Sequence, residues 1–468
     1  MKHYGIFING KWIKQDKGKI KKFTPLTNKL LATYVESNNS HLKLTIESAL
    51  SAQKKWYHFN REYRSKIIEE IAEVILKNKI KLANIERKET GKTSSQAIGE
   101  IEHCYDLWKY AASSLRAFNN ELYDNLDNNY FAFTSYEPIG VVSLITPWNF
   151  PFIVLSERLP YILAAGCSVI IKPSEYASGT TLEFCNLIKN IKVPAGLINV
   201  LTGTGPKIGQ SLVKNKKINM ISFTGSTETG KKIAKIASNN LTKLSLELGG
   251  KNPVVIFDSK NLKNTIKSIL DGAFNNAGQA CVAGNKILVK ENIFDNFMQI
   301  LIKECKKYNS NYFGPINNFS QLKKINNLVS EAKKNNILPV YNGNISQKKS
   351  LFFEPIIYSN VPKKSSLYIC ELFAPILTVN SFKNNAEAEK LCNDTNYGLA
   401  AYIYSEDINL ALHFSKKLKA GRIWLNSNLI NFPQLSIGGY KESGIGRDSG
   451  TSGIKNYSET KSVILKNN

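Results

Sequence analysis

The chain has 468 residues, of which 43% are hydrophobic, and its formal net charge is +25. A chain of this length usually forms two or three domains, and no segment approaches the roughly 18 unbroken apolar residues of a membrane-spanning helix. Because the N-terminal stretch also lacks the apolar run of a secretory signal, we expect a cytoplasmic protein with no membrane partner.

The positive charge comes mainly from lysines spread along the chain, as in "KGKIKKF" and "KECKKY". Nucleic-acid sites favour arginine, whose guanidinium pairs with phosphate and guanine, and arginines are few here. We therefore expect a solvated lysine-rich surface and no nucleic-acid partner. The alternative is that the protein binds polyanions as a side activity. The seven cysteines are scattered without a C-x-x-C pair, which predicts reduced thiols and no metal site.

The predicted elements begin with a largely helical region over residues 40–119 and an extended hairpin arm near 122–137. From Ile139 short apolar strands alternate with amphipathic helices. The expected strands are "IGVVSLIT", "CSVIIK", "LINVL", "INMISF" and "KLSLEL", and the expected helices cover 152–166, 178–190, 208–214 and 227–237. This alternation predicts an α/β fold with a doubly wound parallel sheet, whose ligands bind beyond the carboxyl ends of the strands. A second α/β region begins near Pro253, and "YSETKSVILK" predicts a final strand.

Three loops are rich in small residues. Cys281 lies in "NNAGQACVAGNK", where small and polar neighbours replace the bulky apolar side chains around a core cysteine. "GTGPKIG" has one residue too many for the dinucleotide fingerprint G-x-G-x-x-G. "SFTGSTETG" leaves a strand and opens a helix, so Gly225 and Ser226 lie where a helix N-terminus can hold a pyrophosphate. An ordinary N-cap at Ser226 is the alternative.

Eight motifs occur in a characteristic order along the chain. They are "TPWNFP", "IIKPSE", "FTGSTETG", "LELGGKNP", "GQACVAG", "ELFAPIL", "NYGLAA" and "GGYKESGIGRDSG". Together they resemble the NAD(P)-dependent aldehyde dehydrogenase superfamily over nearly the whole chain. The resemblance implies a dinucleotide-binding domain from 1–119 and 139–249, a catalytic domain from 250–450, and oligomerisation elements at 120–138 and 451–468. We therefore expect a homodimer or homotetramer.

The resemblance also implies catalytic roles for three residues. Cys281 matches the nucleophile, and Asn149 matches the side chain that stabilises the oxyanion of the thiohemiacetal. Glu247 matches the base that activates water to hydrolyse the thioester, and the CoA-acylating branch typically lacks this glutamate. The expected product is therefore a free acid. Capping of the next helix by Asn149 and a plain surface position for Glu247 are the alternatives.

The resemblance places NAD against residues from several motifs, with NADP as a further possibility. Lys172 and Glu175 match the pair that binds the adenine ribose hydroxyls, and a carboxylate there repels the 2′-phosphate of NADP. Glu371 matches the residue that holds the nicotinamide ribose, and Phe373 the one that packs near the nicotinamide, although an ordinary core aromatic is the alternative. The remaining expected cofactor residues are Thr146, Trp148, Gly205, Gly225 and Ser226.

Glu157 is the most informative departure from the family pattern. Many relatives have a tryptophan at this position of the aldehyde tunnel, and succinate semialdehyde enzymes have an arginine. A carboxylate would attract a cationic aldehyde, such as an amino-, guanidino- or betaine-type aldehyde. In the alternative, Glu157 pairs with a residue such as Arg158 and never faces substrate. Phe150 and Phe432 are further expected pocket residues, but Ile437 replaces the tryptophan that would complete an aromatic cage.

Two other functions remain open at this stage. The enzyme could be a semialdehyde or general aliphatic aldehyde dehydrogenase without a charge preference. More remotely, the fold could serve as a non-catalytic structural or polyanion-binding protein, although both Cys281 and Glu247 are present.

Overall fold

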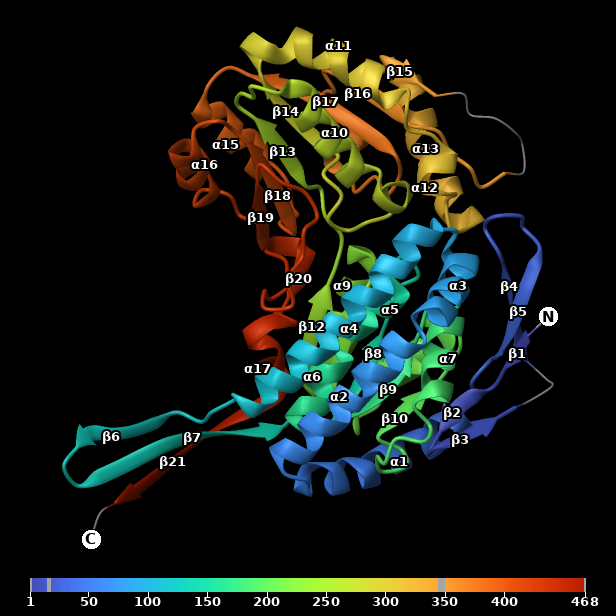
Figure 1. Ribbon diagram of the computed structural model, residues 1–468, viewed down its shortest axis with the longest axis vertical. Helices are drawn as coiled ribbons and strands as arrows, with labels where there is room; N and C mark the ends of the chain where they lie inside the picture. The colour runs from blue at the N-terminus through green and yellow to red at the C-terminus, as the bar shows by residue number, and fades with distance from the viewer. Residues whose placement is uncertain (1, 15–17, 344–349, 467–468) are drawn as a thin grey trace.

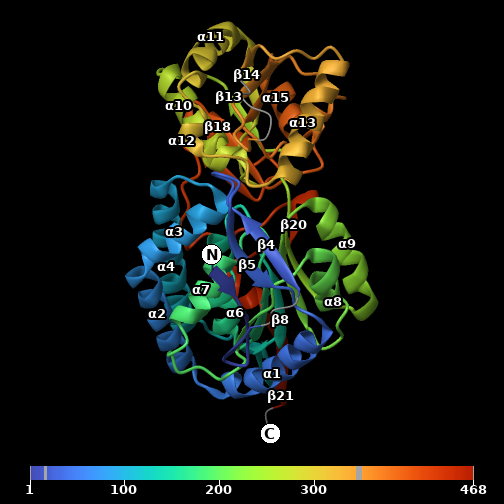
Figure 2. The same cartoon turned by 90° about the vertical axis from the view of Figure 1, so that its right-hand side faces the viewer.

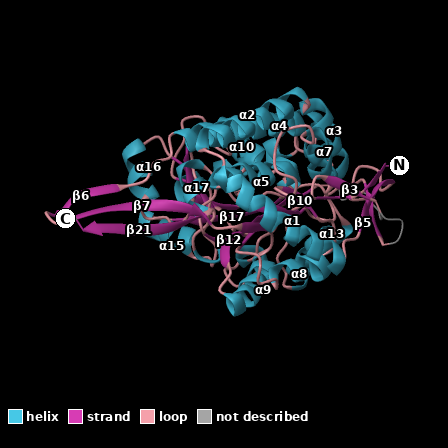
Figure 3. Ribbon diagram, turned by 90° about the horizontal axis from the view of Figure 1, so that it is seen from below, coloured by secondary structure: helices cyan, strands magenta, loops and turns pink. Residues whose placement is uncertain are grey.

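The computed structural model describes residues 2–14, 18–343 and 350–466. Two α/β bodies lie one above the other in Figure 1, and an arm of strands projects from the lower body on the side away from the N-terminus (Figures 1 and 3). Among the described helices, none is both long and apolar enough to span a bilayer.

The lower body is built on an eight-stranded sheet with the order β20-β12-β11-β8-β9-β10-β2-β3. Its five central strands run parallel, which confirms the predicted parallel sheet. They are β8 (Val141–Ile145), β9 (Ser168–Lys172), β10 (Ile198–Val200), β11 (Met220–Thr224) and β12 (Lys243–Glu247). Antiparallel strands at both edges were not predicted: β2 (Ile6–Ile8) and β3 (Lys11–Ile13) at one, and β20 (Gly444–Ile445) at the other.

Both faces of this sheet are covered by helices. Alternate residues of each strand point to opposite faces, so a strand of this sheet packs against a helix layer on each side. Val142 and Leu144 of β8 join one buried cluster, and Val141 and Ile145 join another. The helices of the first cluster are α2 (Arg61–Lys77), α3 (Lys79–Thr90), α4 (Ser94–Arg116), α5 (Pro151–Ser156), α6 (Leu159–Ala165) and α7 (Gly179–Leu187); those of the second are α8 (Gln210–Val213) and α9 (Thr227–Ala237), and α1 (Asn39–His58) contributes residues to both. In Figure 2, α2, α3, α4 and α7 lie on the left, α8 and α9 on the right, and α1 at the bottom.

The single helix expected over 152–166 is wrong, since α5 ends at Ser156 and α6 begins at Leu159. Pro160 lies in the first turn of α6, where its missing N–H is tolerated. The break leaves Glu157 and Arg158 between the two helices, where both side chains are buried.

The upper body contains a seven-stranded sheet with the order β15-β16-β17-β14-β13-β18-β19, parallel except for the edge strand β15. Its strands are β13 (Pro253–Ile256), β14 (Lys286–Lys290), β15 (Tyr341–Asn342), β16 (Ile356–Ser359), β17 (Ile376–Phe382), β18 (Ala400–Tyr404) and β19 (Arg422–Leu425). Its helices are α10 (Leu262–Ala273), α11 (Phe294–Cys305), α12 (Ser310–Phe313), α13 (Phe319–Lys334), α14 (Ser366–Ile369), α15 (Asn385–Asn393) and α16 (Ile408–Ser415).

The arm is the predicted hairpin with the tail added as a third strand. β6 (Leu122–Asp127) and β7 (Tyr130–Pro138) form the hairpin, and β21 (Ser458–Lys466) follows α17 (Gly453–Asn456) and pairs antiparallel with β7 along its whole length. A further small sheet of β1 (Lys2–Tyr4), β5 (Leu30–Val35) and β4 (Lys19–Phe23) lies near the N-terminus. The domain limits assigned from the sequence stay a prediction.

Candidate functional site

The candidate site lies where the strand order of the eight-stranded sheet reverses. The chain passes from β8 through β9 to β10 on one side and continues with β11 and β12 on the other. Ligands of doubly wound sheets bind at this point, beyond the carboxyl ends of the strands. A cavity of about 960 Å³ occupies it, lined by residues from 146–150, 172–176, 205–210, 224–229 and 248–249, which follow the five parallel strands. Cys281, Glu371, Phe373 and residues of α13 close it from the upper body.

One part of the cavity is a helix N-terminus of the kind that binds anions. Gly225 and Ser226 connect β11 to α9 and line the cavity, as does Gly205. The Ser226 side chain accepts a hydrogen bond from the Thr229 N–H at 3.3 Å, so Ser226 is an N-cap as well as a lining residue. A Cβ added at Gly225 would lie 2.5 Å from the Phe223 ring, so the close turn into α9 requires glycine.

The polar groups after β8 and β9 form another part of the cavity. Lys172 donates to the Pro173 carbonyl at 2.9 Å, and its Nζ lies 3.7 Å from Glu175 Oε2. Burial lowers the pKa of Lys172, although the Glu175 carboxylate opposes that shift. Thr146 Oγ1 is buried without a hydrogen-bond partner among the described residues. An unpaired buried hydroxyl costs free energy, so this atom suits a polar ligand in the cavity.

An aromatic pair and a carboxylate lie nearer to the upper body. The rings of Trp148 and Phe373 meet edge-to-face with centroids 5.5 Å apart. Phe373 has a φ of 49°, which is unusual for a residue other than glycine. Glu371 accepts a hydrogen bond from the Gly250 N–H at 3.1 Å, and burial raises its pKa to about 7. These residues present both a flat apolar surface and a hydrogen-bond acceptor to the cavity.

Cys281 follows a strained segment of backbone. Asn276, Ala277 and Gly278 have successive φ values of 50°, 57° and 70°, and such strain persists only where the surroundings hold it. After the turn, Asn252 Nδ2 donates to the Cys281 carbonyl at 2.8 Å and to the Ala283 carbonyl at 2.9 Å. The Cys281 backbone is thereby fixed at the wall of the cavity.

Asn149 is tied to the cysteine loop by reciprocal hydrogen bonds. Its Nδ2 donates to the Gln279 carbonyl at 2.9 Å, and Asn276 Nδ2 donates to the Asn149 carbonyl at 3.1 Å. The N-cap of α5 is Phe150, so Asn149 does not hold the capping position, and its role at the oxyanion stays a prediction. Sequence reasoning did not single out Asn276 and Gln279. Their signal was the amide side chains that stand among small residues in "NNAGQACVAGNK".

Glu247 ends β12 and is buried, which excludes a plain surface position. Burial raises the pKa of Glu247 to about 8; the Arg158 guanidinium opposes this shift, whereas Asp448 and Glu157 add to it. Burial also raises the pKa of the Cys281 thiol, and the Glu247 charge raises it further. Strongly shifted pKa values mark buried groups as candidates for function. Glu247 is not itself part of the cavity lining, and its role as the base stays a prediction.

The two glycines that follow Leu248 allow a close approach of three segments. A Cβ on Gly249 would lie 2.6 Å from the Glu371 carboxylate, and one on Gly250 would lie 2.7 Å from the Cys281 carbonyl. The backbone of "LELGGK" therefore brings the end of β12, with Glu247, next to the cysteine loop.

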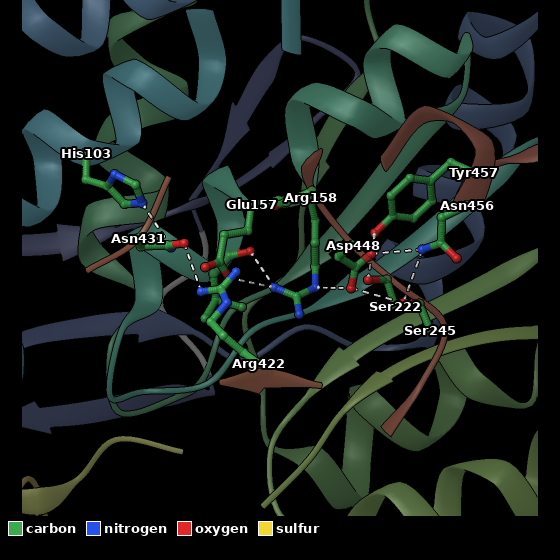
Figure 4. Close-up of polar contacts among 12 residues, drawn as sticks. His103, Glu157, Arg158, Ser222, Ser245, Arg422, Asn431, Asp448, Asn456 and Tyr457 are labelled. Carbon is green, nitrogen blue, oxygen red and sulfur yellow. Dashed lines mark hydrogen bonds and ion pairs between the residues drawn. The ribbon is translucent and has the colours of Figure 1, made fainter. Parts of the chain in front are cut away.

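The buried charges around Glu157 form a connected set (Figure 4). Glu157 Oε2 lies 3.3 Å from Arg158 Nη1, and Arg158 Nε lies 3.0 Å from Asp448 Oδ2. Asp448 also accepts hydrogen bonds from Tyr457 at 2.7 Å and from Ser245 at 3.0 Å. Glu157 does not line the cavity. This geometry favours the alternative in which Glu157 is paired within the protein, and its place in a substrate pocket stays a prediction.

The two aromatic residues expected in the substrate pocket are placed differently. Phe150 lines the cavity beside Asn149, and Lys92 Nζ lies 4.2 Å from the centre of its ring. Phe432 lies between β19 and β20 with 56% of its surface exposed, and it is not part of the cavity lining. The structure thus brings Phe150, but not Phe432, to the cavity that Cys281 lines.

Comparisons with known proteins agree with this geometry. The model of the aldehyde dehydrogenase family matches residues 12–463. A betaine aldehyde dehydrogenase of Bacillus subtilis is 34% identical over 98% of this chain and 96% of its own length. The crystal structure of an NAD-dependent aldehyde dehydrogenase from Sinorhizobium meliloti superposes with a TM-score of 0.96 at 33% identity, covering 99% of this chain and 95% of that one.

A betaine aldehyde dehydrogenase from Staphylococcus aureus, solved in complex with NAD+, also has a TM-score of 0.96 at 33% identity, covering 99% of this chain and 95% of that one. The similarity in sequence and in structure therefore extends over nearly the whole chain, as the eight motifs predicted. This chain belongs to the aldehyde dehydrogenase family.

Proposed function

We propose that this protein oxidises an aldehyde to the carboxylic acid with NAD, through a thioester on Cys281. The observation that supports this most strongly is the convergence of three groups. Cys281 and Asn149 line one cavity and are joined through the Gln279 loop, and the Glu247 charge acts on the Cys281 thiol. The test is whether the wild-type protein forms NADH with aldehydes and whether Cys281→Ala loses this activity.

In the proposed first step, the Cys281 thiol gives its proton to solvent, and its Sγ forms a bond to the carbonyl carbon as the π bond of the carbonyl group opens. The carbonyl oxygen then carries the negative charge. Asn149 Nδ2 has two N–H groups and uses one for the Gln279 carbonyl, so the other can donate to this oxyanion.

NAD, when bound in the cavity, supplies the two-electron oxidant that the conversion of a thiohemiacetal to a thioester requires. Glu247 as a carboxylate then accepts a proton from the water that attacks the thioester. The carbon–sulfur bond breaks, the acid leaves and Cys281 returns as a thiolate. This assignment gives Glu247 the role of general base in hydrolysis.

The cavity suits a dinucleotide, since it combines a helix N-terminus, an unpaired Thr146 hydroxyl and an aromatic pair. We assign the adenine ribose to Lys172 and Glu175 and the nicotinamide ribose to Glu371. Trp148 and Phe373 would flank the nicotinamide, and Gly205, Gly225 and Ser226 would lie near the phosphates. NADP is the alternative cofactor, and the Glu175 charge disfavours binding of its 2′-phosphate.

Replacing Glu175 by serine is expected to raise the ratio of kcat/KM with NADP to kcat/KM with NAD by about tenfold or more, because the carboxylate no longer repels the 2′-phosphate. Steady-state kinetics with both cofactors measure this ratio. Glu102→Gln is the control, since this exposed carboxylate pairs with Lys79 and is not part of the cavity lining. An unchanged ratio in Glu175→Ser would refute the assignment of the ribose site.

Replacing Asn149 by alanine is expected to lower kcat by roughly 10² to 10³-fold, the usual effect of removing one oxyanion donor. NADH binding, followed by fluorescence titration, should remain close to wild type because the amide is not assigned to the cofactor. A small loss of kcat with intact folding would mean that Asn149 does not stabilise the oxyanion.

Whether the enzyme prefers a charged aldehyde depends on whether the Glu157 carboxylate faces the substrate. A free carboxylate there would favour a cationic aldehyde, as the similarity to betaine aldehyde dehydrogenases suggests. The ion pair with Arg158 supports the alternative, an aldehyde dehydrogenase without a preference for positive charge. We adopt this alternative as the proposal.

We also infer a cytoplasmic protein that assembles as a homodimer or homotetramer through the arm. β6 and β21 are both edge strands of the arm sheet, and exposed edges are ready to pair with another chain. Large apolar side chains are exposed along them, namely Leu122, Tyr123, Leu126, Ile464 and Leu465.

A further inference from the structure

The Gln279 side chain, two residues before Cys281, is fully buried and hydrogen-bonded through both of its polar atoms. Its Nε2 donates to the Asn276 carbonyl at 2.9 Å and to the Pro315 carbonyl at 3.3 Å, and its Oε1 accepts from the Asn317 N–H at 2.9 Å. These bonds use both N–H groups of the amide. Gln279 is not part of the cavity lining, so its side chain serves the protein and not a ligand.

The first of these bonds holds the strained turn that precedes Cys281. The Asn276 carbonyl accepts from the backbone N–H of Gln279 at 3.1 Å as well as from its side chain. On the other side of the turn, a Cβ added at Gly278 would lie 2.3 Å from the Ala374 carbonyl, so the turn has no room to move in that direction. A backbone with three successive positive φ values keeps its shape only where such contacts over-determine it.

The other two bonds attach the cysteine loop to residues 314–317, a segment of the upper body that lies against the end of α3. A Cβ added at Gly314 would lie 2.3 Å from the Gly91 carbonyl, and both glycines have positive φ values, 86° and 88°. Asn317 Nδ2 donates to the carbonyl of Glu89 in α3 at 3.0 Å. The segment that holds Gln279 is therefore itself fixed on the lower body.

The two groups proposed to act on the aldehyde come from different bodies. Asn149 follows β8 in the lower body, whereas Cys281 precedes β14 in the upper body. Gln279 joins them, because its carbonyl accepts from Asn149 Nδ2 at 2.9 Å. The Asn149 amide is planar and has two N–H groups, so a bond to one of them sets the direction of the other. The orientation of the Gln279 peptide thus decides where the second N–H group of Asn149 points.

We propose that Gln279 is a positioning residue for the oxyanion site. Its side chain fixes the peptide whose carbonyl orients the Asn149 amide, and residues 314–317 hold that side chain on the lower body. This inference rests on the proposed function, in which Asn149 donates to the oxyanion. A displacement of about 1 Å at a group that positions the reacting atoms lowers a rate by about 10²-fold, so the support behind Asn149 has a large effect on the reaction.

The first test is Gln279→Met, which keeps nearly the same volume and removes all three hydrogen bonds of the side chain. The rate of NADH formation in a single turnover, with the enzyme in excess over the aldehyde, should fall by about 10 to 100-fold. Gln53→Met is the matched control. Gln53 is a half-buried glutamine of α1 that donates to the Gly166 carbonyl at 3.4 Å and does not line the cavity, so this variant should keep the wild-type rate.

A double variant tests whether Gln279 acts through Asn149. If it does, the two replacements are not additive. Introduced into Asn149→Ala, the Gln279→Met change should lower the single-turnover rate further by less than about threefold. Equal losses in the wild-type and Asn149→Ala backgrounds overturn the proposal.

Alkylation of Cys281 by iodoacetamide separates orientation of the oxyanion donor from the order of the cysteine loop. This reaction uses the same thiolate but forms no oxyanion, so Asn149 gives it no assistance. Its rate, followed by mass spectrometry of the peptide that contains Cys281, should be the same in Gln279→Met and in the wild type. A fall as large as that of NADH formation would mean that Gln279 only keeps the loop folded, and would overturn the proposal.

Asn317→Ala is the second variant. It leaves the backbone N–H that Gln279 accepts and removes the side-chain bond to the Glu89 carbonyl. The single-turnover rate should fall by a smaller factor than in Gln279→Met, and again not additively with Asn149→Ala. If thermal unfolding shows that Gln279→Met does not fold, this variant decides.

A wild-type rate in folded Gln279→Met, or in Asn317→Ala when that variant decides, overturns the positioning role and leaves the proposed function in place. Absence of any Cys281-dependent turnover by the wild-type protein would refute the proposed function instead, so the two failures are distinguishable.

Discussion

Replacing Cys281 by alanine is expected to reduce NADH formation by about 10⁴-fold or more, because the nucleophile that forms the covalent intermediate is lost. The measurement is absorbance at 340 nm with a saturating aldehyde and NAD. The cavity should still bind NADH, because the deleted sulfur is not assigned to the cofactor.

Cys370→Ala is the matched control. Cys370 is also a free cysteine, it is exposed, and it is not part of the cavity lining. We expect this variant to retain activity. Full activity in Cys281→Ala, or a comparable loss in Cys370→Ala, would place the nucleophile elsewhere.

Replacing Glu247 by glutamine is expected to lower the steady-state kcat by roughly 10² to 10⁴-fold, the usual contribution of a general base. The first turnover should survive, because the thioester forms before hydrolysis needs the base. Rapid mixing with aldehyde and NAD should therefore give a burst of about one NADH per active site, followed by slow turnover. Loss of the burst together with the steady state would contradict the assignment of Glu247 to hydrolysis.

The pH dependence of hydrolysis follows from the Glu247 pKa of about 8, which burial raises above its ordinary value. Only the carboxylate can accept a proton from water. Hydrolysis should therefore be slow when Glu247 is protonated, rise about tenfold per pH unit below pH 8, and level off above it. Single-turnover hydrolysis of the thioester measured from pH 6 to 10 tests this limb, which should disappear in Glu247→Gln.

The parallel sheet and the cavity at its carboxyl edge were predictable, because short buried strands and amphipathic helices alternate in the sequence. The antiparallel edge strands β2, β3 and β20 were not, since three or fewer residues carry too little periodicity to be recognised. The helix over 152–166 failed for a different reason. Pro160 cannot continue the hydrogen bonds of a helix, and it lies in the first turn of α6, so the break was readable from the sequence and was overlooked. The ion pair of Arg158 with Asp448, which lies in this break, was not readable because it joins distant parts of the chain.

The site could be predicted to the extent that its residues follow recognisable motifs. Cys281, Asn149 and the residues assigned to the cofactor all line the cavity. The supporting contacts could not be predicted, because they join distant parts of the chain. Arg422, Asn431 and His103 belong to no motif, and only the fold brings them together. A sequence shows that Glu157 is charged, but only the structure shows that its carboxylate is buried and lies 3.3 Å from Arg158.

Covalent catalysis by Cys281 is tested most directly by mass spectrometry of the Glu247→Gln protein after it is mixed with an aldehyde and NAD. We expect a mass increase equal to the acyl group of the aldehyde, located on the peptide that contains Cys281 and absent when NAD is omitted and the sample is washed. Turnover of aldehyde by the wild-type enzyme with no acyl adduct on Cys281 in this variant would contradict covalent catalysis by this residue.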